Sequence, residues 1–309
     1  MLKEWLMQGD VSTQYLVLLE IEHQSAENLH KLRDLIALDG NGKNYLDHYH
    51  PETCMWEGIY SPKWTSTHYT LLQLKVLGIN PSIKPYQDGC LNLISSMWQN
   101  KGKIRPYRHQ DMCVVAMMLD LAAYGHLTLD SINEMVDYIL EHQYTDGGWN
   151  CAWERGDLHS SLHTTLSVLE AFRDYYLEGY QYRIKEVLNA IPKAEEFILK
   201  KRLYFSERTG EIIRYDFTLF HYPVGWHYDV LRALEYFASV NHPYDTRMED
   251  ALQLVIARQK KDNTWSMCSP YPGKYYFRYG KTGSPSREIT QRVLKVLQVY
   301  NPKLFHQIY

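Results

Sequence analysis

The chain has 309 residues and a formal net charge of −3, without a basic run or tail, so nucleic acid is not an expected partner. No apolar run approaches the roughly 20 residues needed to cross a bilayer, and the first ten residues lack the apolar core of a signal peptide. Five cysteines without paired spacing argue against a disulfide framework. We therefore expect a cytoplasmic protein without a membrane span.

Helical periodicity dominates the chain, and two kinds of helix alternate along it. The series begins with expected helices near 12–22 and 27–38. Apolar helices with few charges are expected at 64–77, 110–124, 160–172, 225–237 and 286–299. Amphipathic helices are expected at 85–99, 130–143, 184–201 and 245–259.

A buried helix that alternates with an amphipathic helix suits two concentric layers. The sequence therefore predicts an all-α fold, an α/α toroid of about six helix pairs around a central cavity, as in other repeat architectures. No linker composition divides the chain, so we expect one domain over residues 1–309. The long loops near 41–62 and 203–222 are expected to lie over one rim.

A loop motif recurs after two of the amphipathic helices. The segments from Gln143 to Trp149 and from Gln259 to Trp265 both read Gln-x-x-x-Gly/Asn-x-Trp. Recurrence of a motif between helices is typical of repeat folds. We expect Trp149 and Trp265 to brace the loops between the two layers.

The apolar helices can be aligned on a leucine that a charged residue follows. The aligned pairs are Leu74-Lys75, Leu119-Asp120, Leu169-Glu170, Leu234-Glu235 and Leu294-Lys295. One register position near each helix start is then held by His68, Cys113, His163, Tyr228 and Glu288. We expect this position to surround the mouth of the cavity, where helix N-termini favour anions. The 26 tyrosines and 8 tryptophans suit an aromatic wall.

The Gln-Trp segments resemble those of the prenyltransferase and squalene-cyclase superfamily, whose fold is an α/α toroid. The likeness covers most of residues 60–300, and segments 62–71, 147–165 and 283–287 are similar to short bacterial squalene-cyclase-like proteins. Triterpene cyclases use an Asp-x-Asp-Asp acid and two such domains. This chain has no such motif, and it has room for one domain.

The segment from Arg105 to Cys113 is similar to the zinc site of protein prenyltransferase β-subunits. The resemblance implies that Asp111, Cys113 and His163 bind zinc, and that Arg105 and Arg108 hold a prenyl diphosphate. Thiolate, imidazole and carboxylate suit zinc and leave a position open for a substrate thiol. The alternative is that Cys113 is a small buried hydrophobe and that Asp111 begins a helix. Because those enzymes work with a second helical subunit, the resemblance admits such a partner.

Two further sets complete the candidate site. His159 precedes His163 by four residues, so we expect both on one helix face, with His159 as another ligand or a proton shuttle. His227, Tyr228 and Asp229 begin the next apolar helix and are the catalytic candidates, unless Asp229 merely supports the helix start.

Trp64, His68 and Trp226 are expected substrate contacts, and the alternative for His68 is a core histidine. The leading hypothesis is a prenyltransferase or terpenoid-type enzyme. It would hold zinc at the mouth of an aromatic cavity and act on a small apolar substrate that can carry a diphosphate. One alternative is a carbohydrate lyase or hydrolase that uses Tyr, His and Asp at the rim. The other is a non-catalytic module that holds a lipid or a peptide.

Overall fold

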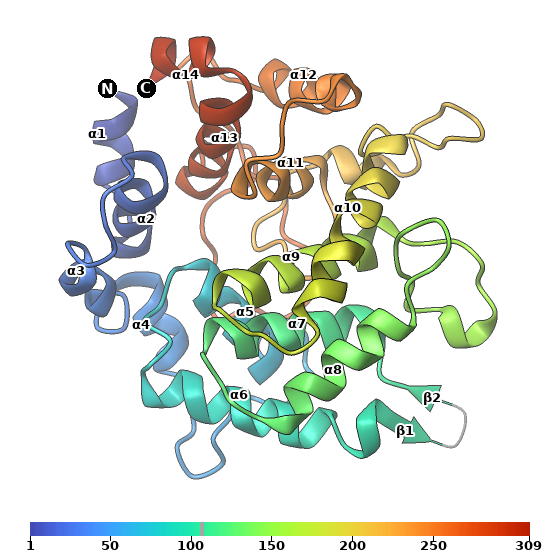
Figure 1. Cartoon of the computed structure of the whole chain (residues 1–309). Coiled ribbons are helices and arrows are strands. Elements are labelled where there is room, and N and C mark those ends of the chain that lie inside the picture. Colours follow the sequence, from blue (N-terminus) through green and yellow to red (C-terminus); the bar gives the residue numbers. More distant parts are fainter. Residues whose placement is uncertain (106–107) are drawn as a thin grey trace.

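The computed structural model describes residues 1–105 and 108–309, and helices make up most of it (Figure 1). The predicted all-α class is confirmed. The helices are α1 Leu2–Met7, α2 Val11–Leu16, α3 His30–Leu35, α4 Gly40–Leu46, α5 Thr67–Val76, α6 Lys84–Met97, α7 Met112–Tyr124, α8 Asp130–Glu141, α9 Leu162–Leu177, α10 Ile184–Lys200, α11 Val230–Ser239, α12 Glu249–Ala257, α13 Arg287–Tyr300 and α14 Pro302–Ile308. Two short strands that we did not predict, β1 (Lys103–Arg105) and β2 (Arg108–His109), pair as an antiparallel hairpin.

The apolar helices pack against one another in chain order. Helix α5 contacts α7, α7 contacts α9, α9 contacts α11, and α11 contacts α13. Helix α13 in turn contacts α2 and the π-helical turn Val17–Ile21 that extends it. Helix α7 can pack closely against neighbours on several sides, because almost every one of its residues from Met112 to Ala123 is apolar and buried.

The amphipathic helices cover this inner set from outside. Helix α6 packs on α5 and α7, α8 on α7, α10 on α9, α12 on α11, and α14 on α13. Each buries one face, as in α8, where Ile132, Met135, Val136 and Ile139 recur at helical spacing. The predicted alternation of two helix kinds is therefore present. Within the described residues, no helix is both long and apolar enough to cross a membrane.

Trp149 and Trp265 make the same pair of hydrogen bonds. Trp149 Nε1 donates to the Ile139 carbonyl of α8 at 2.7 Å, and its backbone N–H donates to Thr165 Oγ1 of α9 at 3.0 Å. Trp265 repeats both bonds at 2.7 and 3.0 Å, to α12 and to Thr290 of α13. Each indole therefore joins an outer helix to the inner helix that follows, which confirms the predicted bracing role.

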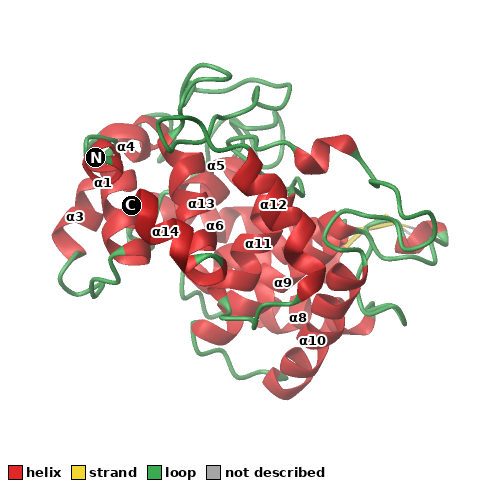
Figure 2. Ribbon diagram, turned by 90° about the horizontal axis from the view of Figure 1, so that it is seen from above, coloured by secondary structure: helices red, strands yellow, loops and turns green. Residues whose placement is uncertain are grey.

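Long loops gather beside α4 and α5 (Figure 2). Trp64 Nε1 donates to the Pro272 carbonyl at 2.9 Å, and the Tyr276 hydroxyl donates to the Thr65 carbonyl at 2.7 Å. The segment 266–286 therefore packs against the loop before α5. The predicted loop at 41–62 is shorter than expected, because α4 occupies its start.

Candidate functional site

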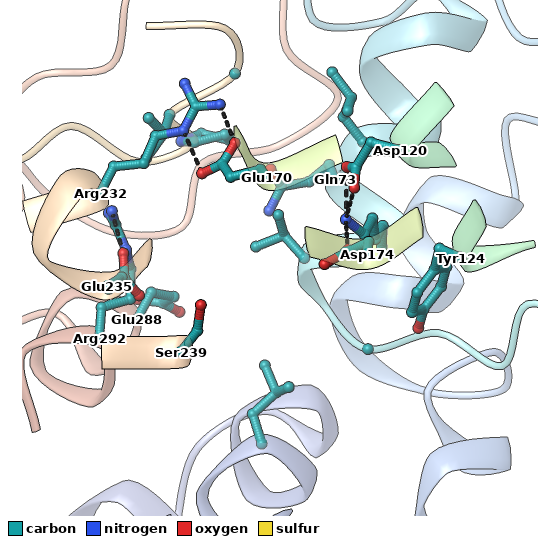
Figure 3. A pocket seen from close by; sticks show the side chains of 18 of the residues that line it. Gln73, Asp120, Tyr124, Glu170, Asp174, Arg232, Glu235, Ser239, Glu288 and Arg292 are labelled. Atoms are coloured by element: carbon teal, nitrogen blue, oxygen red, sulfur yellow. Dashed lines mark hydrogen bonds and ion pairs between the residues drawn. The ribbon is translucent and has the colours of Figure 1, made fainter. Parts of the chain in front are cut away.

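A cavity of about 580 Å³ lies where the inner helices meet (Figure 3). Residues of α2, α5, α7, α9, α11 and α13 all line it, together with Trp64, Tyr275 and the loop 222–225. The volume falls in the usual range for small-molecule sites. The expected central cavity therefore exists, and its lining decides what it can hold.

Charged side chains occur all around the cavity wall, among aromatic and aliphatic ones. The residue after the aligned leucine lines the cavity in every inner helix, and Glu20 after Leu19 extends the series. The members are Glu20, Lys75, Asp120, Glu170, Glu235 and Lys295. The alignment of the helices contained this signal, but we took the charges as a means of alignment and not as a site. The wall therefore combines aromatic side chains, as predicted, with charged side chains that were not predicted as part of a site.

The wall charges pair across neighbouring helices (Figure 3). Lys75 Nζ lies 2.6 Å from a carboxylate oxygen of both Asp120 and Asp174. Arg232 Nε donates to Glu170 Oε1 at 2.9 Å.

Two further pairs complete the series and involve α13. Arg292 Nε donates to Glu235 Oε2 at 2.7 Å, and Lys295 Nζ donates to Glu20 Oε1 at 2.9 Å. Because pairs of this kind cancel most of the local charge, the wall does not present one sign to a ligand.

Burial and pairing set opposite protonation tendencies for the two carboxylates that share Lys75. Burial raises the pKa of Asp120 to about 7, although Lys75 opposes the shift. Burial also acts to raise the pKa of Asp174, but Arg173 and Lys75 outweigh it and hold this pKa well below its usual value. Asp120 is therefore partly protonated near neutral pH, whereas Asp174 stays ionised.

One sector of the wall keeps polar groups that are only partly paired. Glu288 accepts a hydrogen bond from Ser286 Oγ at 2.7 Å, and burial raises the pKa of its carboxyl. The buried Nη1 of Arg292 has no hydrogen-bond partner among the described residues. Gln73 Nε2 donates to the hydroxyls of Tyr222 and Tyr279, both at 3.0 Å. The motif analysis did not single out Gln73, Tyr222 or Arg292.

Most of the predicted contact residues meet in a second region, which we call the rim cluster: Trp64, His68, Tyr69, His163, Trp226, His227 and Tyr271. The His227 ring stacks between Tyr271 at 3.4 Å and Trp226 at 3.9 Å, and Trp226 lies 5.1 Å from His163.

The remaining members of the rim cluster extend to the cavity. Trp64 lies 5.8 Å from His227, and Tyr69 lies 4.9 Å from Trp64 and 5.0 Å from His68, all between ring centroids. A chain of ring contacts therefore joins Trp64, His68, His163 and His227, of which register predicted the shared position of His68 and His163. Because Trp64 and Tyr69 also line the cavity, the two regions meet there.

The histidines of the rim cluster are neutral. Burial lowers the pKa of His68 and of His227 to about 3, and that of His163 to about 4. His68 is fully buried, and neither ring nitrogen has a partner among the described residues. Within the same part of the chain, His163 Nε2 and the Tyr271 hydroxyl are also buried without a partner.

Tyr228 and Asp229 have structural contacts. The Tyr228 hydroxyl donates to the Leu203 carbonyl, and its backbone N–H donates to His163 Nδ1 at 2.8 Å. Asp229 is fully buried and caps α11, because its Oδ1 accepts from the Arg232 N–H at 2.8 Å. Asp229 therefore supports a helix start, which was the alternative to its catalytic role. The expected helix at 225–237 begins later, at Val230, for the same reason.

The predicted zinc ligands are not arranged as a metal site. Asp111 is the residue before α7, the Cys113 N–H donates to Cys151 Sγ, and His163 Nδ1 accepts the Tyr228 N–H. Across residues 1–105 and 108–309, no group of three or more His, Cys, Asp or Glu could hold a metal ion. The residues in this arrangement do not fit zinc, which stays a prediction from the resemblance.

The remaining candidates lie outside the cavity wall. Helix α9 begins at Leu162, so His159 is an exposed loop residue, and its expected place on one helix face with His163 is wrong. Arg105 and Arg108 are exposed partners on the β1–β2 hairpin. A diphosphate role for these arginines stays a prediction. Comparison with known proteins adds no assignment: no known protein family and no curated protein matches the chain.

Proposed function

We propose that the chain forms a closed α/α toroid. We further propose that its central cavity binds a neutral or zwitterionic small molecule rich in hydroxyl groups, and that the protein acts on this molecule as a hydrolase or lyase. The chain-order packing of the inner helices, and the Lys295–Glu20 contact between α13 and the π-helical turn after α2, support the toroid (Figure 1).

The polarity of the wall supports this ligand class. Lys75, Glu170, Glu235 and Lys295 keep part of their surface exposed, so water can reach them. The apolar prenyl group of a ligand would displace that water without replacing its hydrogen bonds, which is unfavourable. A hydroxyl-rich ligand can replace them, and the balanced pairing gives no strong preference for anions or cations. The prenyl-transfer hypothesis, which led from the sequence alone, therefore becomes the less favoured proposal.

The proposed hydrolase or lyase activity rests on Glu288. Glu288 lines the cavity, and burial raises the pKa of its carboxyl, which favours the protonated form that a general acid needs. Arg292 Nη1 can donate to a ligand oxygen, and Tyr222 stays a phenol, because burial raises its pKa well above the usual value. Tyr275 and Trp64 stack nearly parallel, at 6°, and form an aromatic surface in the same wall.

The test uses neutral oligosaccharides and polyols beside farnesyl diphosphate, with calorimetry for binding and product analysis for turnover. The expected result is binding and turnover of a neutral hydroxylated compound. Glu288→Gln should lower kcat by about 100-fold or more and leave KM within about threefold, because a proton donor is lost without loss of hydrogen-bonding shape. Glu178→Gln, another wall carboxyl, is the matched control and should keep kcat.

Two results would contradict the proposal. Binding of farnesyl diphosphate without binding of any neutral hydroxylated compound would favour the prenyl-transfer hypothesis instead. Equal kcat in wild type and Glu288→Gln would remove Glu288 from the reaction. Cys113→Ser separates the chemistries further, because a thiolate–zinc mechanism needs Cys113 and a carboxyl-driven mechanism does not.

A further inference from the structure

Cys113 contacts Cys151, and the sequence did not indicate this contact. Cys151 lies in the loop 149–161 between α8 and α9, and its Sγ accepts the Cys113 backbone N–H at 3.2 Å across 38 residues of chain. Both cysteines are half-buried, whereas Cys90 is fully buried. The two side chains also interact with each other, so the thiol that the resemblance assigns to zinc lies beside a second thiol.

Both neighbouring inner helices supply a polar group to the Cys151 sulfur. Cys113 is the second residue of α7, and N–H groups at a helix start have no acceptor within the helix. Thr164 Oγ1, in the first turn of α9, lies 3.4 Å from the same sulfur. The Cys113 N–H is a fixed donor to this sulfur, and a donor placed in this way favours the thiolate form of a cysteine, which is the nucleophilic form.

We propose that Cys113 and Cys151 form a redox-active dithiol that hydrogen peroxide oxidises to a disulfide. The Cys151 thiolate attacks one peroxide oxygen, the O–O bond breaks, and the departing hydroxide takes a proton to become water. The Cys113 sulfur then attacks the resulting sulfenic acid. The S–S bond forms, the S–O bond breaks, and the Cys113 proton leaves with the hydroxyl as a second water. Two thiols are oxidised, and one peroxide is reduced.

The surroundings favour a small oxidant. Both sulfurs are half-buried beside α7 and α9, outside the cavity wall, so a large disulfide substrate has little access. The product would tie the loop 149–161 to the first turn of α7. This proposal does not depend on the ligand of the cavity. It competes directly with zinc, because a metal bound to Cys113 would block the reaction.

The experiment oxidises the full chain with an equimolar amount of hydrogen peroxide after its zinc content is measured. Remaining thiols are counted in denaturant, and alkylated peptides are identified by mass spectrometry. The expected result is a fall from five thiols to three, because two of the five cysteines become linked. One cross-linked peptide should contain Cys113 and Cys151, about 2 Da lighter than the separate thiols.

Three variants separate the roles, and circular dichroism checks that each is folded. Cys113→Ser should leave a sulfenic acid on Cys151 that dimedone traps, and Cys151→Ser should slow oxidation of Cys113 by about tenfold or more. Cys268→Ser, a half-buried cysteine elsewhere, is the matched control and should still lose two thiols. Five unreacted thiols, a cross-link to another cysteine, or bound zinc that protects Cys113 would each overturn the proposal.

Discussion

The cavity wall and the rim cluster hold polar groups inside the protein in opposite ways. The wall keeps its charges and pairs them across helices, as Lys75 does with Asp120 and Asp174. The rim cluster keeps no charge: burial makes its histidines neutral, and several of their nitrogens have no partner within the described residues. Pairing and neutralisation are the two ways to avoid the cost of an isolated buried charge. The two regions should therefore respond differently to mutation and to pH.

The largest effect is expected in the wall. Lys75→Met removes the cation that two buried carboxylates share, so it should lower the free energy of unfolding by about 3–5 kcal/mol at pH 8. Lys84→Met on α6 is the control, because Lys84 is exposed and pairs with Asp88 at the surface, and it should leave stability nearly unchanged. Urea unfolding monitored by circular dichroism measures both. Equal stability of the two variants would show that the wall charges act as solvated surface charges.

The next effect concerns acid and the rim cluster. His68 has a folded pKa of about 3 against 6.5 for the free side chain, so the unfolded chain takes up a proton first as pH falls below 6.5. The contribution of His68 to the free energy of unfolding is therefore fully present above pH 6.5. It decreases as the pH falls toward 3, and about 2 kcal/mol is lost at pH 5.

Comparison with a variant isolates this contribution, because Asp120 and Glu288 have raised pKa values and act in the opposite direction. The loss of stability between pH 8 and pH 5 should be about 2 kcal/mol smaller in His68→Leu than in wild type. Parallel pH profiles for the two proteins would mean that His68 is protonated, or has a partner, in the folded state.

The smallest effect is expected at an unpartnered hydroxyl. Tyr271→Phe removes a buried hydroxyl without a partner in the described structure, so the free energy of unfolding should stay within about 0.5 kcal/mol or increase. Tyr228→Phe is the matched change, because the Tyr228 hydroxyl donates to the Leu203 carbonyl, and it should cost about 1–2 kcal/mol. A cost above about 1 kcal/mol for Tyr271→Phe would indicate that a bound molecule partners this hydroxyl.

Local patterns made the helices, the two tryptophan braces and most of the rim cluster predictable, but not Tyr69 or Tyr271. Register places His68 and His163 near the starts of two apolar helices, α5 and α9, and helical spacing alone brings such positions to one end. Helix ends were less predictable. Asp229 caps α11, so that this helix starts later than expected, and His159 lies in the loop before α9 and not in the helix.

The cavity wall and the thiol pair depend on contacts between distant parts of the chain. The charged position after each aligned leucine was visible, but a charge in sequence usually indicates solvent exposure, and pairing becomes evident only when neighbouring helices are placed. Cys113 and Cys151 belong to a helix and to a loop whose path no periodicity describes.

The tryptophan braces also have a consequence for the order of folding. Trp149 bonds to residues 10 and 16 positions away, and Trp265 to residues 10 and 25 positions away, whereas Lys295 reaches Glu20 across 275 residues. Short separations cost little chain entropy, so each braced helix pair can assemble early and by itself. The contact between α13 and the first helices joins the most distant segments. We therefore expect it to form last and to set the overall rate of folding.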